Sequence, residues 1–159
     1  MNPEIRRRLF ALYAEVDAAV AAVGPICDAS GRCCRFKEYD HALFISQIEA
    51  EALIEAAPAF EQPVSAEFCP FQKDNLCTAR EPRPLGCRIY YCDPSYQDTM
   101  YAVTESSLRK IKAIAEEFET GWRYAPLHLF LNEAKLGEQD PASADKTSSS
   151  RIALPLAVQ

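Results

Sequence analysis

Four of the seven cysteines lie in one stretch, Cys69 to Cys92, and this stretch constrains the fold more than any other part of the sequence. It also contains three of the eleven prolines and four Lys or Arg residues. Because proline fixes φ and removes a backbone donor, and no helical or strand period runs far through the stretch, it cannot rely on a buried apolar face. We therefore expect its thiolates to bind metal and to hold its shape in that way.

The other three cysteines lie in an earlier loop, as Cys27, Cys33 and Cys34. Adjacent residues of an extended segment point to opposite sides, so Cys33 and Cys34 are not expected to serve one ion in the same way. Either they serve two metal positions, or one of them packs as a small apolar group. His41 follows this loop and is a further candidate ligand, although a surface or hydrogen-bonded histidine is the more common case.

Charge and hydropathy exclude several classes of partner. The formal net charge is −6 and the pI about 5.0, which argues against sequence-independent nucleic-acid binding. No stretch approaches the roughly 18 apolar residues that span a bilayer, and the arginine-rich N-terminus reads as an amphipathic helix rather than a secretory signal. We therefore expect a cytoplasmic protein with no membrane partner. Thiols stay reduced there, and seven cysteines are an odd number for disulfides, so metal or redox chemistry is favoured.

The apolar periodicity predicts a mainly α fold. Helices are expected over residues 3–23, 47–57, 104–120 and 126–136, with a capping box at Ser46 and Glu49 and an earlier start signal at Asp93. Residues 41–45 are expected to be a short strand or extended segment, and Asp74 and Asn75 to make a tight reversal. The prediction is one metal-binding domain over residues 1–136, in which two to three longer helices pack around an irregular cysteine-rich core with few short strands. Residues 137–159 are small, polar and proline-containing, and are expected to be a disordered tail.

Cationic side chains are concentrated near the cysteines. Seven of the seventeen Lys or Arg residues lie in the two cysteine loops, at Arg32, Arg35, Lys37, Lys73, Arg80, Arg83 and Arg88. Thiolate sites are anionic, so these cations are expected to lower the thiol pKa values and to stabilise the metal-bound form. The alternative is that they only keep two loops soluble.

The cysteines and their neighbours form a recognisable pattern. It reads Cys27-x5-Cys33-Cys34, Cys69-Pro70-Phe71, Cys77, and Arg83-Pro84-x2-Cys87-Arg88-x-Tyr90-x-Cys92. This pattern, over residues 27–92, resembles the bacterial zinc- or iron-chelating cysteine-cluster family of the YkgJ type. The resemblance implies metal binding and makes all seven cysteines candidate ligands: Cys27, Cys33, Cys34, Cys69, Cys77, Cys87 and Cys92. Flagellin lysine methylases look like larger, distant relatives in which an iron–sulfur cluster is implicated, but this chain lacks their extra length, so methyl transfer is not implied.

Two kinds of metal centre remain open from the sequence. The spacing matches neither a ferredoxin run nor a zinc ribbon, and more than four cysteines suits a multi-iron cluster, a two-metal site, or one site with extra thiols. We expect an iron–sulfur cluster first, with zinc as the alternative. Three functions are compatible with such a metal centre. The first is a redox protein or enzyme, in which Tyr90, Tyr91 and Arg88 could surround the site. The others are a structural zinc module that acts through a partner and a metal-handling protein. Catalytic residues are not assigned, and the partner is an unidentified small molecule or protein.

Overall fold

The computed structural model describes residues 1–135, and within them the mainly α class is confirmed. The helices are α1 (Pro3–Val23), α2 (Gln47–Ala56), α3 (Leu85–Ile89), α4 (Gln97–Glu117) and α5 (Leu127–Glu133). The strands are β1 (Phe44–Ser46), β2 (Gln72–Lys73), β3 (Leu76–Cys77) and β4 (Tyr124–Pro126), and the 3-10 turns are η1 (Arg32–Cys34) and η2 (Pro94–Tyr96). The predicted tail, residues 137–159, lies outside the described residues.

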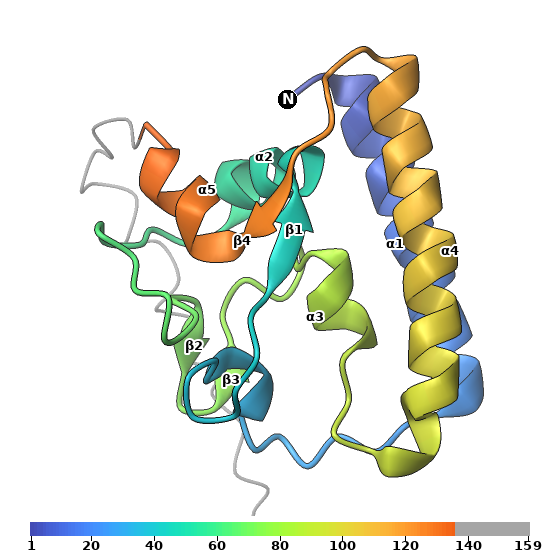
Figure 1. Ribbon diagram of the computed structural model, residues 1–159, viewed down its shortest axis with the longest axis vertical. Helices are drawn as coiled ribbons and strands as arrows, with labels where there is room; N and C mark the ends of the chain where they lie inside the picture. The colour runs from blue at the N-terminus through green and yellow to red at the C-terminus, as the bar shows by residue number, and fades with distance from the viewer. Residues whose placement is uncertain (136–159) are drawn as a thin grey trace, which may run out of the picture.

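The two longest helices, α1 and α4, lie side by side and run in opposite directions along one side of the molecule (Figure 1). The bounds of α1 are those predicted: Asn2 accepts from the backbone N–H of Glu4 at its start, and Gly24 ends it in the left-handed conformation. The apolar stripe of α1 packs against Ile111 and Ile114 of α4 and against α3. This pair, joined by α3, therefore forms one of two hydrophobic clusters.

Helix α4 begins earlier than its stronger sequence signal indicated. We expected a start near Thr104, but the helix starts at Gln97, directly after η2. The side chain of Asp93 accepts from the backbone N–H of Ser95 and caps η2, so the earlier of the two start signals is the one the chain uses. Thr104 instead donates its hydroxyl to the carbonyl of Met100, a bond that is compatible with a position inside a helix.

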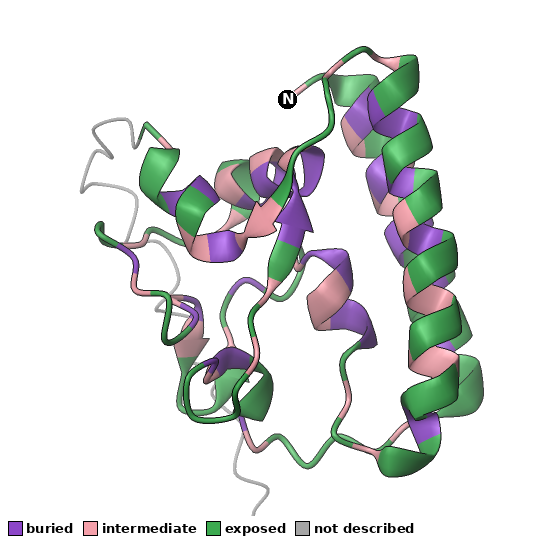
Figure 2. Cartoon of the chain, viewed as in Figure 1, coloured by how far each residue is buried: buried purple, intermediate pink, exposed green. Residues whose placement is uncertain are grey.

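The second cluster lies around α2, α5 and the antiparallel pair of β1 and β4 (Figures 1 and 2). Strand β1 supplies buried Ile45, and Ser46 caps α2 through the predicted capping box with Glu49. Buried Leu127 and Leu131 come from α5. Two cysteines, Cys34 and Cys69, belong to this cluster, so the segments that carry them pack onto it.

Part of the proline-rich stretch is regular. The predicted reversal at Asp74 and Asn75 is confirmed: both have positive φ and join β2 to β3 in a short hairpin whose register pairs Gln72 with Cys77. After this hairpin the chain forms α3, a short helix that periodicity did not reveal because it spans only five residues. Its N-terminus follows Pro84, which cannot donate a backbone hydrogen bond and suits a helix start.

Two buried polar side chains, Glu49 and Arg88, tie α3 to its neighbouring helices. Glu49 of α2 accepts hydrogen bonds from the hydroxyl of Tyr13 at 3.2 Å and from the backbone N–H of Leu85 at 2.8 Å, which fixes the start of α3 against α1 and α2. Arg88 of α3 pairs with Asp17 of α1 at 2.5 Å. Helix α3 is thus held in place against α1 and α2. Across residues 1–135, none of the helices is long and apolar enough to cross a membrane.

Candidate metal centre

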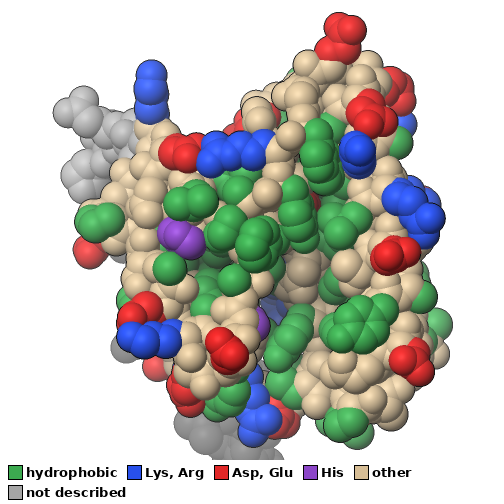
Figure 3. All heavy atoms as spheres, in the orientation of Figure 1, with side chains coloured by type: hydrophobic (Ala, Val, Ile, Leu, Met, Phe, Trp, Pro, Cys, Tyr) green, Lys and Arg blue, Asp and Glu red, His purple; other side chains and the backbone are tan. Residues whose placement is uncertain are grey.

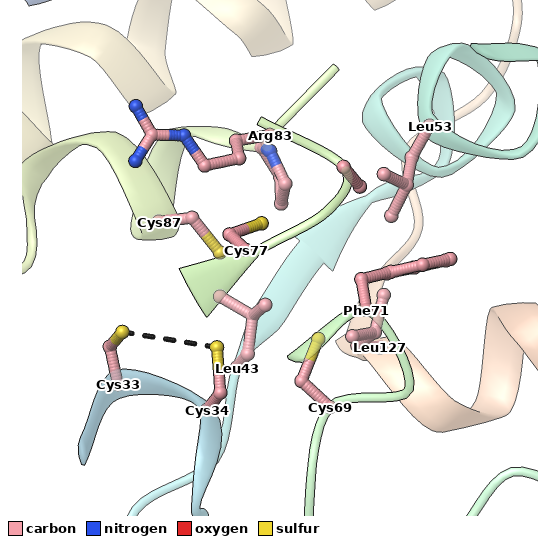
Figure 4. Close-up of a pocket in the computed structure, with 12 residues that line it drawn as sticks. Cys33, Cys34, Leu43, Leu53, Cys69, Phe71, Cys77, Arg83, Cys87 and Leu127 are labelled. Carbon is pink, nitrogen blue, oxygen red and sulfur yellow. Dashed lines mark hydrogen bonds between the residues drawn. The ribbon is translucent and has the colours of Figure 1, made fainter. Parts of the chain in front are cut away.

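Five of the seven cysteines line one small cavity of about 40 Å³ (Figure 4). They come from three separate segments of the chain: η1, the region around the β2–β3 hairpin, and α3. These five are Cys33, Cys34, Cys69, Cys77 and Cys87. The remaining wall is mostly apolar and includes Leu43, Leu53, Phe71 and Leu127. Five of the seven cysteines, drawn from both loops, therefore border the same cavity.

Backbone hydrogen bonds bring the first loop onto the second. The N–H of Cys69 donates to the carbonyl of Cys34 at 2.8 Å, and the N–H of Lys37 donates to the carbonyl of Glu67 at 3.0 Å. Just before η1, the carbonyl of Gly31 accepts a hydrogen bond from the side-chain amide of Gln72 at 2.7 Å. These bonds hold Cys34 beside Cys69 without any contribution from the thiols.

The adjacent cysteines do not behave as an extended pair. We expected Cys33 and Cys34 to point to opposite sides, but they lie in the 3-10 turn η1, and their sulfurs are 3.8 Å apart. The backbone turns at this point because Gly31 takes a left-handed conformation with φ of 73°. Both thiols line the same cavity, and Cys33 is also exposed to solvent. Two such neighbours can therefore serve one site.

Helix α3 places Cys87, and its neighbour Arg88 holds the loop before it. The Arg88 guanidinium donates to the carbonyls of Arg83 at 2.8 Å and Glu81 at 2.5 Å, and lies 4.3 Å from the ring centre of Tyr13. Arg88 is buried, so these contacts are shielded from water. This arrangement fixes residues 81–83 and thereby sets Arg83 in the wall of the cysteine cavity.

Three thiols of this cavity, those of Cys33, Cys34 and Cys87, have raised pKa values and so hold their protons tightly when no metal is bound. The bond with Cys34 and burial raise the pKa of Cys33 well above its usual range, and burial and the nearby thiols do the same for Cys87. For Cys34, the bond with Cys33 lowers the pKa, but the contact with Cys69 and burial outweigh it and raise it from 9.0 to about 12. Any metal that binds these thiols must displace protons.

The lowering of thiol pKa values expected from the surrounding cations is outweighed in the metal-free protein, and three of the seven cations are paired with carboxylates. Arg35 pairs with Glu38, Lys37 with Glu67, and Arg88 with Asp17. Among the seven cations, Arg83 alone lines the cavity within the described residues. Its charge lowers the pKa of Cys33 and Cys87, but burial and the neighbouring thiols outweigh it.

Cys27 and Cys92 lie apart from this cavity. Both are exposed, and neither is among its lining residues. The backbone N–H of Ile26 donates to the carboxylate of Asp93 at 3.1 Å, so the segments that carry these two cysteines are tied to each other near the end of α1. The seven predicted ligands thus divide into an inner set of five and an outer pair, Cys27 and Cys92.

The donor chemistry of the inner set fits a thiophilic metal, but its geometry is not that of a completed site. Two sulfurs bound at about 2.3 Å to one tetrahedral zinc ion lie roughly 3.8 Å apart, which is the separation of Cys33 and Cys34. In residues 1–135, no three or more His, Cys, Asp or Glu side chains are gathered closely enough to hold an ion. Binding would thus require the inner thiols to lose protons and move closer together.

Sequence reasoning missed the apolar wall of the cavity. Leu43 directly precedes β1 and Leu127 directly follows β4, and the N–H of Leu127 donates to the carbonyl of Leu43 at 2.8 Å. The apolar run after Pro126 indicated a buried segment, but nothing in the sequence indicated that this segment lies beside the cysteines. His41, a candidate ligand in the sequence, does not line this cavity; its ring stacks on Tyr90 instead.

Comparison with known proteins adds no assignment. No family model matches the chain, and no curated protein and no solved structure matches it either. The resemblance of residues 27–92 to the cysteine-cluster family therefore stays a prediction, and the site is interpreted from its own geometry.

Proposed function

We propose that this chain is a cysteine-cluster metal-binding protein that holds an iron–sulfur cluster between its two cysteine loops. The observation that carries the proposal is that five cysteines from three chain segments line one small cavity. Isolated cysteines commonly pack as small apolar residues, but such packing does not account for five of them around a single space. Soft thiolates are the ligands that iron–sulfur clusters and zinc prefer.

Iron–sulfur clusters and structural zinc ions are both held by four ligands, so the five inner thiols are enough for either centre. The preference for a cluster rests on the resemblance of residues 27–92 to the cysteine-cluster family. When bound, an iron–sulfur cluster would supply electron transfer. Cys33, Cys34, Cys69, Cys77 and Cys87 are the residues that would hold it, and Arg83 would offset part of its negative charge. Cys33 is exposed, which would leave one side of the centre open to a reaction partner.

Structural zinc is the second candidate, and the size of the cavity favours it. A space of about 40 Å³ suits one ion better than a multi-iron cluster, for which the loops would have to move apart. The 3.8 Å separation of the Cys33 and Cys34 sulfurs also suits a single tetrahedral ion. In this case the metal would only cross-link the loops, and the protein would act through a partner surface. A metal-handling protein would use the same thiols with weak, exchangeable binding.

Anaerobic purification followed by elemental analysis and a visible spectrum tests these candidates. An iron–sulfur protein is expected to contain iron and acid-labile sulfide and to absorb broadly in the visible range. A colourless protein with stoichiometric zinc, which unfolds when a chelator is added, would identify the structural module. Metal that exchanges readily with a weak chelator while the fold persists would identify metal handling. A folded protein that binds neither iron nor zinc under any of these conditions would disprove metal binding.

A further inference from the structure

A second cavity, of about 240 Å³, adjoins the cysteine cavity and opens outward from it. The two share Cys33, Leu43 and Cys87 in their walls, so one thiol-lined boundary separates them. We call this outer space the aromatic groove. Its other lining residues are His41, Ala42, Phe44, Gly86, Tyr90 and Tyr124. A molecule in the groove would therefore lie next to two of the five inner cysteines.

Aromatic rings from three chain segments form the walls of the groove. His41 and Tyr90 lie nearly parallel, with ring centres 5.5 Å apart and an angle of 11° between the planes. Phe36 contacts His41 edge-on at 5.4 Å and supports it from within the protein. Phe44 and Tyr124 lie 5.8 Å apart, on β1 and β4. These ring faces can stack on another flat ring, an arrangement that aromatic groups favour.

The ring surface continues beyond the groove on the outer face of the molecule. Trp122 stacks on Tyr124, with centres 6.1 Å apart and an angle of 6° between the planes. Phe44, Tyr90, Trp122 and Tyr124 remain between 36% and 43% exposed, although large apolar rings are usually more buried. Figure 3 shows hydrophobic side chains gathered across the middle of the face that carries β1 and β4. Exposed rings grouped around a cavity are typical of a binding surface.

The charge and size of the groove limit what can bind. None of its lining residues is Asp, Glu, Lys or Arg, so it provides no partner for a charged ligand. Polar contacts are available from the phenol groups of Tyr90 and Tyr124, the imidazole of His41, and two thiols. The volume lies below the roughly 300–1,000 Å³ of pockets for drug-sized ligands. A small, uncharged ligand with one or two polar substituents meets these limits.

We propose that the aromatic groove binds a planar, uncharged ring compound of one or two fused rings, stacked on the groove's ring faces. The ligand's inner edge lies against Cys33 and Cys87. Binding itself requires only the described groove, whereas contact of the ligand with a metal centre rests on the proposed function. If both hold, the ligand is the small molecule on which the centre acts.

Titration with 1-naphthol tests the proposal, with the saturated alcohol decahydro-1-naphthol as the comparison ligand. Dissociation constants come from ligand-observed saturation-transfer NMR on the reduced, full-length protein. Trp122 is the only tryptophan, so its indole N–H signal locates the ligand at the neighbouring groove. We expect 1-naphthol to bind more tightly than the saturated alcohol and to shift the Trp122 signal, because only a flat ring can stack on both walls.

Three variants test the contribution of the ring faces. Tyr90→Leu and Tyr124→Leu keep apolar bulk but remove one ring each, and should raise the Kd for 1-naphthol about two- to tenfold. Tyr101→Leu is the matched control, because Tyr101 is 64% exposed on α4 and does not line the groove. Equal binding of the two alcohols by the unmodified protein, or unchanged affinity in both groove variants, would overturn the proposal.

Metal content measured on the same samples separates this proposal from the proposed function. Stacking-dependent naphthol binding by a protein without metal would support the groove and count against the metal centre. If the unmodified protein binds metal but binds 1-naphthol no more tightly than the saturated alcohol, the metal centre is supported and the groove proposal is rejected.

Discussion

The backbone N–H of Cys69 donates to the carbonyl of Cys34 at 2.8 Å, and this bond joins the two cysteine loops at the edge of the thiol cavity. A buried backbone pair of this kind contributes to the fold independently of any thiol chemistry. The bond from Gln72 to the carbonyl of Gly31 extends the contact. The loops are therefore positioned by the polypeptide, and a metal ion would bind to thiols that are already neighbours.

Replacement of Gly31 by alanine should separate the loops. Gly31 has φ of 73°, and an added Cβ would lie 2.4 Å from the side-chain nitrogen of Gln72 and 3.1 Å from the Cα of Asn75. The left-handed conformation alone costs an alanine about 1–2 kcal/mol, and the contacts add to this cost. Gly121→Ala is the matched control, because Gly121 has φ of 76° with nothing within 4 Å of the added atom.

Urea denaturation and metal stoichiometry would measure the difference between these two glycine variants. Gly31→Ala should lose more stability than Gly121→Ala and should bind less metal. Equal losses in the two variants would show that the approach of the loops at Gly31 does not matter for the site.

Glu49→Gln should destabilise the protein by about 1–3 kcal/mol, because buried donors would lose their acceptors. One carboxylate oxygen accepts from Tyr13 and from the backbone of Leu85, and the other accepts from the backbone and hydroxyl of Ser46. A glutamine retains only one oxygen and turns an N–H₂ group toward one pair of donors. Chemical denaturation would measure the change. Glu51→Gln, on the same helix but less buried, should shift stability by less than about 0.5 kcal/mol.

Local signals in the sequence were sufficient to predict the longer helices. The stripe of α1 and its Gly24 stop, the Ser46–Glu49 capping box and the Asp74–Asn75 reversal each act within a few residues, so the structure confirms them. The start of α4 was misplaced because two capping signals competed, and the choice between them depends on packing of Tyr96 into the core.

The arrangement of the site could be predicted only in part, because it depends on contacts between distant segments. The number of cysteines gave reason to expect the two loops to lie near each other, and five of the cysteines do line one cavity. The 3-10 turn that aligns Cys33 with Cys34, and α3, which carries Cys87, are set by Gly31 and Glu49 through long-range bonds. The aromatic groove combines residues 41–44, 86–90 and 124, and no local pattern announces such a combination.

Alkaline pH should destabilise the metal-free protein through Cys34. Its pKa is raised from 9.0 to about 12 in the fold, so the folded state holds this proton more tightly than the unfolded state does. The resulting stability is fully present below about pH 9 and is lost as the pH rises from there toward 12. Urea midpoints of the reduced, chelator-treated protein at about pH 8 and pH 10.5 would measure the loss. The Cys34→Ala variant lacks this thiol, so its urea midpoint should fall less between the two pH values than that of the unmodified protein. An equal fall in both proteins would show that other groups cause the effect.

Serine substitutions should divide the seven cysteines into the inner and outer sets. Cys34→Ser and Cys69→Ser remove thiols that are buried in the shared cavity, so each should abolish stoichiometric metal binding or weaken it by at least about tenfold. Cys27→Ser and Cys92→Ser alter exposed side chains outside that cavity, and these variants should keep their metal. Elemental analysis of the four anaerobically purified proteins would decide. If Cys27→Ser and Cys92→Ser lost metal as completely as the inner variants, the loop that Ile26 ties to Asp93 would have to close over the site, and the division would be wrong.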